Sequence, residues 1–122
     1  MESNVSIKVL KDKVQSFCEE RDWNQFHNPK DLAIGISTEA NELLDLFRFK
    51  SEEDMMDMLN DSVKRCSIEE ELADTFFFIL RFAQRNNMDL AEILYEKMKK
   101  NALKYPVEKA KGSNLKYTEY ER

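Results

Sequence analysis

The sequence predicts an all-α fold, an antiparallel bundle of four to five helices that assembles into an oligomer. Glycine and proline number only 2 each in 122 residues, so the usual signals of tight hairpins and short strands are missing. Apolar residues recur at helical spacing, and Ser, Asp and Asn stand where helix caps are expected. A single domain of this length leaves about a third of its unfolded surface exposed. We therefore expect the bundle to complete its core by self-association.

The first two helices follow from apolar stripes and one cap. Apolar residues spaced by three and four predict a helix over 5–21. After an irregular segment, Asn28 supplies an N-cap and Pro29 a favoured first residue, which predicts a helix over 29–49. The inward residues are expected to be Ile7, Leu10, Val14 and Phe17 in the first helix and Leu32, Ile36, Leu43 and Phe47 in the second.

Two further helix starts lie in the middle of the chain. Ser51 precedes three acidic residues, which the helix dipole favours in a first turn, so a short amphipathic helix is expected there. Ser67 and Glu70 resemble a capping box and predict a long helix to Arg85, with a start that can lie several residues earlier. Its apolar residues are Leu72, Phe76, Ile79, Leu80 and Ala83.

The C-terminal third divides into a helix and a tail. Asp89 and Glu92 form another capping box, and the helix that follows should stop at Tyr105-Pro106. We therefore predict a helical domain over 1–106 and a polar tail over 107–122, which is either part of the same domain or partly disordered.

Charge and composition exclude several classes of function. The 24 acidic and 19 basic residues give a net charge of -5, which disfavours a nucleic-acid surface. No apolar stretch approaches the roughly 20 residues of a membrane span, and the N-terminus lacks the apolar run of a signal peptide. Cys18 and Cys66 are too far apart to indicate a disulfide framework or a zinc site. We expect a cytoplasmic protein with no membrane partner.

Two pairs of carboxylates carry the chemistry. Glu39 and Glu42 lie three residues apart on one predicted helix, and Glu71 and Asp74 lie three apart on another. Residues at this spacing share a helix face, about 5–6 Å apart. Four clustered carboxylates repel one another unless a divalent cation neutralises them, and Mg²⁺ or Mn²⁺ suits oxygen ligands. Because Mg²⁺ usually also binds phosphates, a polyphosphate is the natural substrate.

Two other readings of these acids remain open. Acidic pairs arise by chance in a chain with 24 acidic residues, so the stripe can be a solvated face of a non-catalytic helical adaptor whose aromatic residues dock a partner helix. A carboxylate-bridged di-iron bundle shares the paired acids but needs Glu-x-x-His on two helices. The only histidine, His27, lies outside both motifs, which disfavours the di-iron class.

The E-x-x-E pair, 28 intervening residues and the E-x-x-D pair resemble the signature of the MazG-like all-α nucleoside triphosphate pyrophosphohydrolases. Further segments resemble the dCTP pyrophosphatase branch: Arg21 to His27, Glu39 to Lys50, Glu70 to Asp74, Lys97-Met98, Asn101, Tyr105-Pro106, Gly112-Ser113 and Lys116 to Thr118. The resemblance implies that 1–106 is a catalytic domain and that Glu39, Glu42, Glu71 and Asp74 are its catalytic Mg²⁺ ligands. It further implies a homotetramer or a homodimer.

The reaction implied by the resemblance is hydrolysis of a (deoxy)nucleoside triphosphate to its monophosphate and pyrophosphate. The favoured substrate is dCTP or a C5-modified dCTP, which implies cleaning of the nucleotide pool. Phe49, Phe78 and Val14 depart from animal relatives, which have Trp, Tyr and a substrate-contacting His at the matching positions. These departures leave the metal chemistry intact and weaken the expectation of strict dCTP specificity.

The resemblance also implies nucleotide contacts, each of which has a plainer structural alternative. Trp23 can be a half-buried loop anchor, Phe49 and Phe78 can be core residues, and Lys97 an ordinary surface residue. The expected substrate-binding residues are Trp23, Asn24, Gln25, Phe26, His27, Phe49, Phe78, Lys97, Asn101 and Tyr105. Candidate neutralisers of phosphate charge outside the metal ligands are Lys50, Arg81, Lys111 and Lys116.

Overall fold

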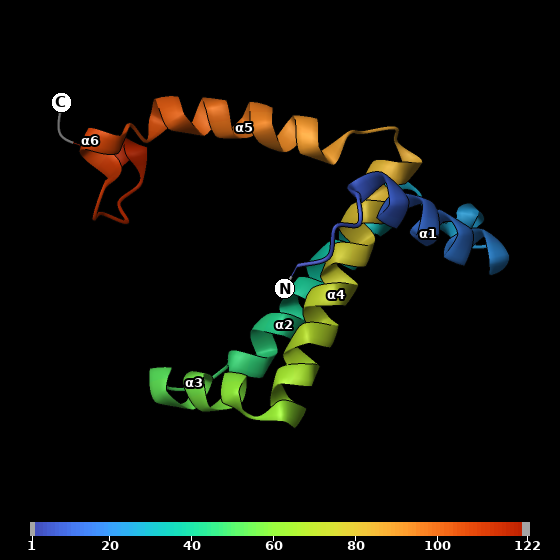
Figure 1. The fold of residues 1–122 in the computed structure, drawn as a ribbon, viewed down its shortest axis with the longest axis horizontal. Helices are drawn as coiled ribbons and strands as arrows, with labels where there is room; N and C mark the ends of the chain where they lie inside the picture. Colours follow the sequence, from blue (N-terminus) through green and yellow to red (C-terminus); the bar gives the residue numbers. More distant parts are fainter. Residues whose placement is uncertain (1, 121–122) are drawn as a thin grey trace. The chain divides into compact units, whose positions relative to one another are not determined.

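The computed structural model of this chain describes residues 2–120 (Figure 1). All the regular structure within this range is helical. The described range contains no strand, so the predicted all-α class is confirmed. By their contacts the residues divide into two units, 1–87 and 88–122. The elements are α1 (Ile7–Glu20), η1 (Asn24–Phe26), α2 (Pro29–Phe47), α3 (Glu52–Asn60), α4 (Ser62–Arg85), α5 (Leu90–Lys104), α6 (Val107–Ala110) and η2 (Tyr117–Glu119), where η marks a short 3₁₀ helix.

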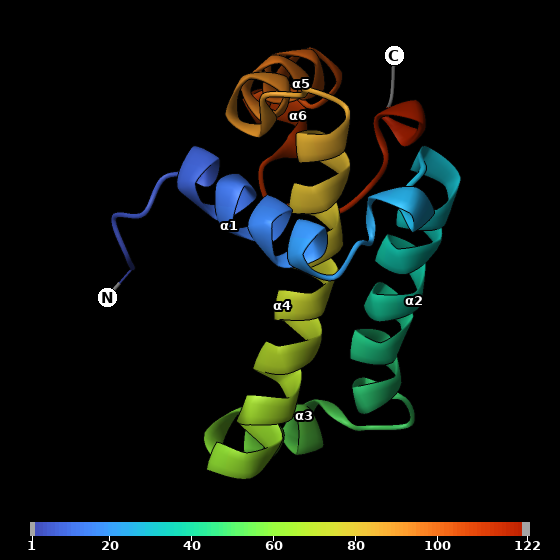
Figure 2. The same ribbon diagram turned by 90° about the vertical axis from the view of Figure 1, so that its right-hand side faces the viewer.

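The centre of the first unit is the antiparallel pair α2 and α4, which lie side by side along most of their length (Figure 2). Gly35 on α2 allows this close approach, since a Cβ atom there would lie 2.6 Å from ring atoms of Phe78 on α4. α1 also packs against α4, and α3 packs against the beginning of α4. The close helix pair fixes how the side chains of α2 and α4 face each other.

The core of the first unit is small and lies where these helices meet α4. The buried apolar residues are Val14 and Cys18 of α1, Leu32 of α2, Met58 of α3, and Ile68, Leu80 and Ala83 of α4. Phe17, predicted to face inward, is instead 42% exposed, and two apolar residues of the predicted α4 pattern, Leu72 and Phe76, are 57% and 40% exposed. Leu72 follows Glu71 by about 100° around the helix, so with Glu71 facing α2 the leucine turns away. Carboxylates occupy part of the stripe predicted to be apolar.

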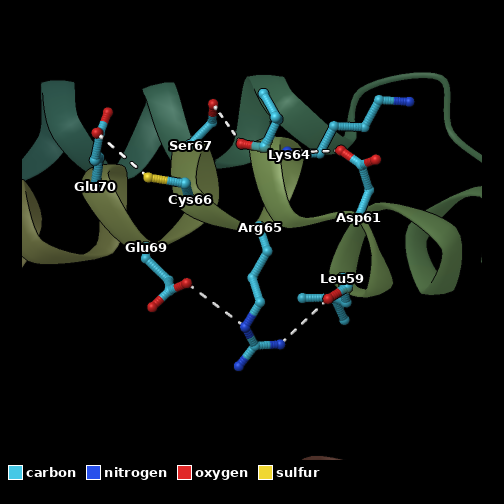
Figure 3. Close-up of polar contacts among 9 residues, drawn as sticks. Leu59, Asp61, Lys64, Arg65, Cys66, Ser67, Glu69 and Glu70 are labelled. Atoms are coloured by element: carbon cyan, nitrogen blue, oxygen red, sulfur yellow. Dashed lines mark hydrogen bonds and ion pairs between the residues drawn. The ribbon is translucent and has the colours of Figure 1, made fainter.

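The start of α4 differs from the predicted capping box. Asp61 is the N-cap, and its carboxylate accepts a hydrogen bond from the Lys64 backbone N–H at 3.0 Å (Figure 3). Ser67 lies one turn and more inside the helix, where its hydroxyl donates to the Val63 carbonyl. The helix therefore begins at Ser62, because an Asp cap satisfies the free N–H groups there before the serine is reached.

The other predicted caps are confirmed. Asn28 accepts from the Asp31 N–H, Asp89 accepts from the Glu92 N–H, and Ser51 forms a reciprocal capping box with Asp54. Each of these side chains satisfies a backbone donor that the first helical turn leaves without a partner.

The second unit contains α5 and the described part of the tail. α5 ends at Lys104, before Pro106, as predicted. Residues 107–120 include the short helices α6 and η2, and the Tyr105 ring contacts the Tyr117 and Tyr120 rings edge-on, with centroids 5.9 and 6.0 Å away. α5 therefore groups with the described part of the tail, and the boundary after residue 106 between the catalytic domain and the tail stays a prediction. Residues 121 and 122 of the predicted tail lie outside the described residues.

None of the described helices combines the length and the apolar character needed to cross a bilayer.

Candidate active site

The facing stripes of α2 and α4 bring three predicted carboxylates together. Glu39 and Glu42 of α2 and Glu71 of α4 each offer one carboxylate oxygen, and these oxygens all lie within 4.8 Å of one another. Asp74 follows Glu71 by three residues on α4, and its negative charge raises the pKa of Glu39 and of Glu71. We call these four residues the carboxylate cluster.

The carboxylate cluster is electrostatically unfavourable in the protein alone. Burial raises the pKa of Glu39 to about 7, with further contributions from Glu42, Asp74 and Glu71. Interaction with the Glu42 carboxyl is the main cause that raises the pKa of Glu71, followed by burial. Glu39 Oε2 and Glu71 Oε2 are both buried and have no hydrogen-bond partner.

These properties fit a divalent cation. A buried carboxylate oxygen without a hydrogen-bond partner costs free energy. Such an atom in a folded protein calls for an explanation, and a bound ligand or ion that contacts it is one. A cluster made only of carboxylate oxygens is the donor set that Mg²⁺ and Mn²⁺ prefer. Glu39 and Glu71 come from different helices, so a cation held between them also depends on the close packing of α2 against α4.

A second polar cluster lies further along α4, where Arg81 meets the segment 23–27. The guanidinium of Arg81 is completely buried and donates from Nε to His27 Nδ1 at 2.8 Å and from Nη2 to Asn24 Oδ1 at 2.5 Å. Its Nη1 donates to Gln84 Oε1 at 2.6 Å. We call Asn24, His27, Arg81 and Gln84 the arginine cluster. Arg81, which the sequence suggested as a neutraliser of phosphate charge, is thus buried and bonded to protein acceptors.

The rest of the segment 23–27 lies at the surface around this anchor. Trp23 is half-buried, with its ring 5.7 Å from the Phe17 ring and 5.9 Å from the His27 ring. Gln25 and Phe26 are exposed. The segment therefore presents aromatic surface to solvent while Asn24 and His27 tie it to α4.

Phe49 and Phe78 have opposite surroundings. The Phe49 side chain is 91% exposed, directly after α2, and its backbone is left-handed with φ 61°. The Arg48 guanidinium lies 4.8 Å from its ring centroid. A bulky residue in this region of φ is strained, and strain of this kind concentrates at functional sites. Phe78 is partly buried against Gly35, so its immediate role is to pack α4 on α2.

An open groove runs along α2 beside the carboxylate cluster. It measures about 730 Å³, within the range of small-molecule sites, and Glu42 belongs both to it and to the cluster. Arg48, whose guanidinium lies beside the Phe49 ring, also lines it. The lining residues are Thr38, Asn41, Glu42, Leu44, Asp45 and Arg48.

The remaining predicted contacts belong to the second unit. Lys97, Asn101 and Tyr105 lie at helical spacing along α5 and its C-cap, and the Tyr105 backbone N–H donates to the Asn101 carbonyl at 2.8 Å. Lys97 is exposed, whereas Asn101 and Tyr105 are partly buried within this unit. Their assignment to the nucleotide stays a prediction.

The chain is similar in sequence to known proteins. The chain is 36% identical to dCTP pyrophosphatase 1 of Mus musculus over 106 residues, and 35% identical to dCTP pyrophosphatase 1 of Homo sapiens over 103 residues. These matches cover 87% and 84% of this chain but 62% and 61% of the relatives. This chain thus spans less than two thirds of the length of those relatives.

A solved structure shows the same fold. The crystal structure of a pyrophosphatase from Archaeoglobus fulgidus superposes with a TM-score of 0.77 at 31% sequence identity, over 87% of this chain and 97% of that one. Residues 34–120, which include all four members of the carboxylate cluster, match the MazG-like family. The chain therefore belongs to the MazG-like family.

Proposed function

We propose that this chain is a Mg²⁺-dependent nucleoside triphosphate pyrophosphohydrolase that releases a nucleoside monophosphate and pyrophosphate. The observation that carries the proposal is the carboxylate cluster, in which Glu39 Oε2 and Glu71 Oε2 are buried without a partner. Hydrolases of the MazG-like family are generally metal-dependent. The relatives named as dCTP pyrophosphatases and the similar pyrophosphatase structure support the reaction class.

In the proposed reaction Glu39, Glu42, Glu71 and Asp74 hold Mg²⁺, for which Mn²⁺ can substitute. The bound cation supplies Lewis-acid polarisation of the phosphate chain, charge neutralisation on the departing pyrophosphate and a lowered pKa for a bound water. A carboxylate oxygen of the cluster that does not bind metal accepts the proton of the attacking water. The closely packed helices keep these oxygens in place before substrate arrives, so little reorganisation is needed.

The groove along α2 is the proposed place of the phosphate chain, because Glu42 lines both the groove and the carboxylate cluster. Arg48, whose guanidinium lies beside the exposed Phe49 ring, lines the same groove, and Phe49 is proposed to contact the nucleotide there. The segment Trp23 to His27 and Phe78 are proposed to contact the base, and Lys97, Asn101 and Tyr105 the rest of the nucleotide. We propose dCTP or a C5-modified dCTP as substrate, with cleaning of the nucleotide pool as the role, because the curated relatives carry that substrate in their names.

We further propose that the chain is a homo-oligomer, with a tetramer favoured over a dimer. Apolar side chains of α5 support this, because Ile93, Leu94 and Met98 are all exposed in the second unit and form one side of the helix. Sedimentation is expected to give a multiple of the 14.5 kDa chain mass, and a single-chain mass would contradict the proposal. The two free thiols, Cys18 and Cys66, are consistent with the expected cytoplasmic location.

The function is tested by pyrophosphate release from each common dNTP and NTP, with Mg²⁺ and with EDTA, while chromatography identifies the nucleotide product. We expect metal-dependent formation of the monophosphate, with dCTP or its 5-methyl form among the best substrates. Dependence on metal with dCTP among the poorest would remove the proposed base preference and keep the reaction class. No turnover of any triphosphate, together with no Mg²⁺-dependent rise in Tm, would contradict the enzyme.

A further inference from the structure

The arginine cluster has no role in the metal chemistry, although it contains the most completely buried charge of the described residues. Arg81 has 0% exposure, yet its three observed acceptors, His27 Nδ1, Asn24 Oδ1 and Gln84 Oε1, are all neutral groups. Burying a guanidinium without a carboxylate bonded to it costs free energy, and several good hydrogen bonds are needed to offset that cost. Two of the three bonds go to the segment that the proposed function places at the nucleobase.

The bond from Arg81 fixes the chemical form of His27. An arginine Nε always carries a hydrogen, so His27 Nδ1 must accept through a lone pair. In the neutral ring the remaining proton is then on Nε2. His27 thus keeps a single N–H donor, at Nε2.

The charges around His27 favour the same neutral form. Burial, followed by the positive charges of Arg81 and Arg85 on α4, lowers the pKa of His27. Arg85 also donates to the Asn24 carbonyl at 3.4 Å. On α1, the neighbouring titratable groups are Cys18, whose pKa is raised mainly by burial, and Glu19, whose charge acts on Arg81. A protonated His27 would direct two donors at each other, Nδ1–H and Arg81 Nε–H.

We propose that Arg81 is a positioning residue for substrate binding: it ties the segment 23–27 to α4 and holds His27 as the neutral Nε2–H tautomer, a donor for an acceptor atom of the nucleotide. This inference rests on the proposed function for the identity of the ligand. The tautomer and the clamp themselves do not depend on any substrate, so they can be measured separately.

The first test is nuclear magnetic resonance of the full chain with ¹⁵N-labelled histidine, without nucleotide or metal. His27 is the only histidine, so one ring gives all the signals. We expect an unprotonated Nδ1 and a protonated Nε2 at neutral pH, with a titration midpoint below 6.5. In Arg81→Met the midpoint should rise toward 6.5 and the two tautomers should mix, while Arg65→Met, an exposed arginine of the same helix, should leave the signals unchanged. A protonated Nδ1, or no difference in Arg81→Met, would overturn the clamp.

The second test separates binding from chemistry with Arg81→Lys. Lysine keeps the charge but cannot bond three diverging acceptors, so we expect KM for the triphosphate to rise by about tenfold, the equivalent of one lost hydrogen bond to a charged group. The kcat value and the Mg²⁺ concentration for half activity should change by less than about twofold, since the carboxylate cluster is untouched. A fall in kcat at unchanged KM would contradict a positioning role in binding.

Two substitutions of His27 keep the inference testable if Arg81 variants fail to fold. Asparagine places its amide oxygen near the position of Nδ1 and lacks the distal donor, so His27→Asn should keep the urea midpoint and raise KM. The longer glutamine side chain places its amide near the position of Nε2 and leaves no acceptor for Arg81 near the position of Nδ1. His27→Gln should therefore lower the urea midpoint. Equal behaviour of the two variants would overturn the assignment of separate roles to the ring nitrogens. If wild-type protein turns over no triphosphate, the proposed function fails, and the ring signals still decide the clamp.

Discussion

The carboxylate cluster and the arginine cluster both place ionisable side chains of α4 against another segment, yet they differ in how far the protein satisfies them. Arg81 donates to three protein acceptors, and its geometry is complete without any ligand. Glu39 Oε2 and Glu71 Oε2 are buried without a hydrogen-bond partner, and the surrounding acids repel them. Polar groups that the fold completes stabilise structure, whereas groups that it leaves incomplete point to a ligand.

This difference between the two clusters indicates which of them should respond to added metal. Mg²⁺ is expected to stabilise the protein through the carboxylate cluster and to leave the arginine cluster unaffected.

The largest effect is expected from Glu71→Gln. We expect pyrophosphate release to fall by at least about a hundredfold, because a metal ligand that stabilises charge contributes several kcal/mol to the barrier. Tm in EDTA should rise, since the amide removes one negative charge and can donate to the remaining carboxylates. The matched control is Glu70→Gln, an exposed neighbour outside the cluster. Full turnover by Glu71→Gln would contradict its assignment as a ligand.

The next effect concerns the packing that holds the two pairs of acids together. Gly35→Ala should lower the free energy of unfolding by about 1–3 kcal/mol, because the new Cβ would lie 2.6 Å from the Phe78 ring. This net loss is expected although alanine gains roughly 1 kcal/mol over glycine from helix propensity, because the steric clash with the Phe78 ring outweighs that gain.

Urea unfolding measures the Gly35→Ala effect, with Ser37→Ala on the exposed side of α2 as control. Mg²⁺ affinity should fall in the Gly35 variant, while the ring signals of His27 stay unchanged. Stabilisation by Gly35→Ala would show that the helices are not in close contact there.

The pH dependence of stability should have opposite signs in the two clusters. Glu39 has a folded pKa of about 7 against an ordinary 4.5, so in EDTA its contribution is complete below pH 4.5 and is lost as the pH rises to 7. The loss should be on the order of 1 kcal/mol after solvent screening. His27 has a lowered folded pKa, so its contribution is complete above the ordinary value of 6.5 and is lost as the pH falls below it.

Urea unfolding from pH 4.5 to 8 separates these contributions. Saturating Mg²⁺ or Glu39→Gln should remove the loss toward high pH and leave the loss toward low pH, whereas Arg81→Met should reduce the latter. If Mg²⁺ does not change the dependence of unfolding free energy on pH, the proposed metal site is contradicted.

The smallest effect is expected at Phe49, next to the groove and outside both clusters. Asparagine adopts a left-handed backbone more readily, and a ring that is 91% exposed contributes little burial, so Phe49→Asn should stabilise the fold by up to about 1 kcal/mol. KM for the triphosphate should rise if the ring contacts nucleotide. Stabilisation with an unchanged KM would remove Phe49 from the proposed binding site.

Much of the helical arrangement could be predicted from local patterns. The caps at Asn28, Ser51 and Asp89 were identifiable because capping depends on residues within one turn. The local pattern at Ser67 suits a cap, and the sequence left open a start several residues earlier; the Asp61 cap shows that the helix begins at Ser62 and that Ser67 lies inside it. Leu72 was misplaced because carboxylates occupy part of the inward stripe, so hydrophobicity alone does not mark that face.

The sequence by itself determined the helical class, the pairing of Glu39 with Glu42 and of Glu71 with Asp74, and the resemblance on which the reaction class depends. These are local properties, set by spacing along one helix. Only the tertiary structure decided that the pairs meet, that Glu39 and Glu71 keep buried oxygens without partners, and that Arg81 binds His27 from 54 positions away in the chain. Burial and partners depend on which surfaces pack together, as the close contact of Gly35 on α2 with Phe78 on α4 illustrates.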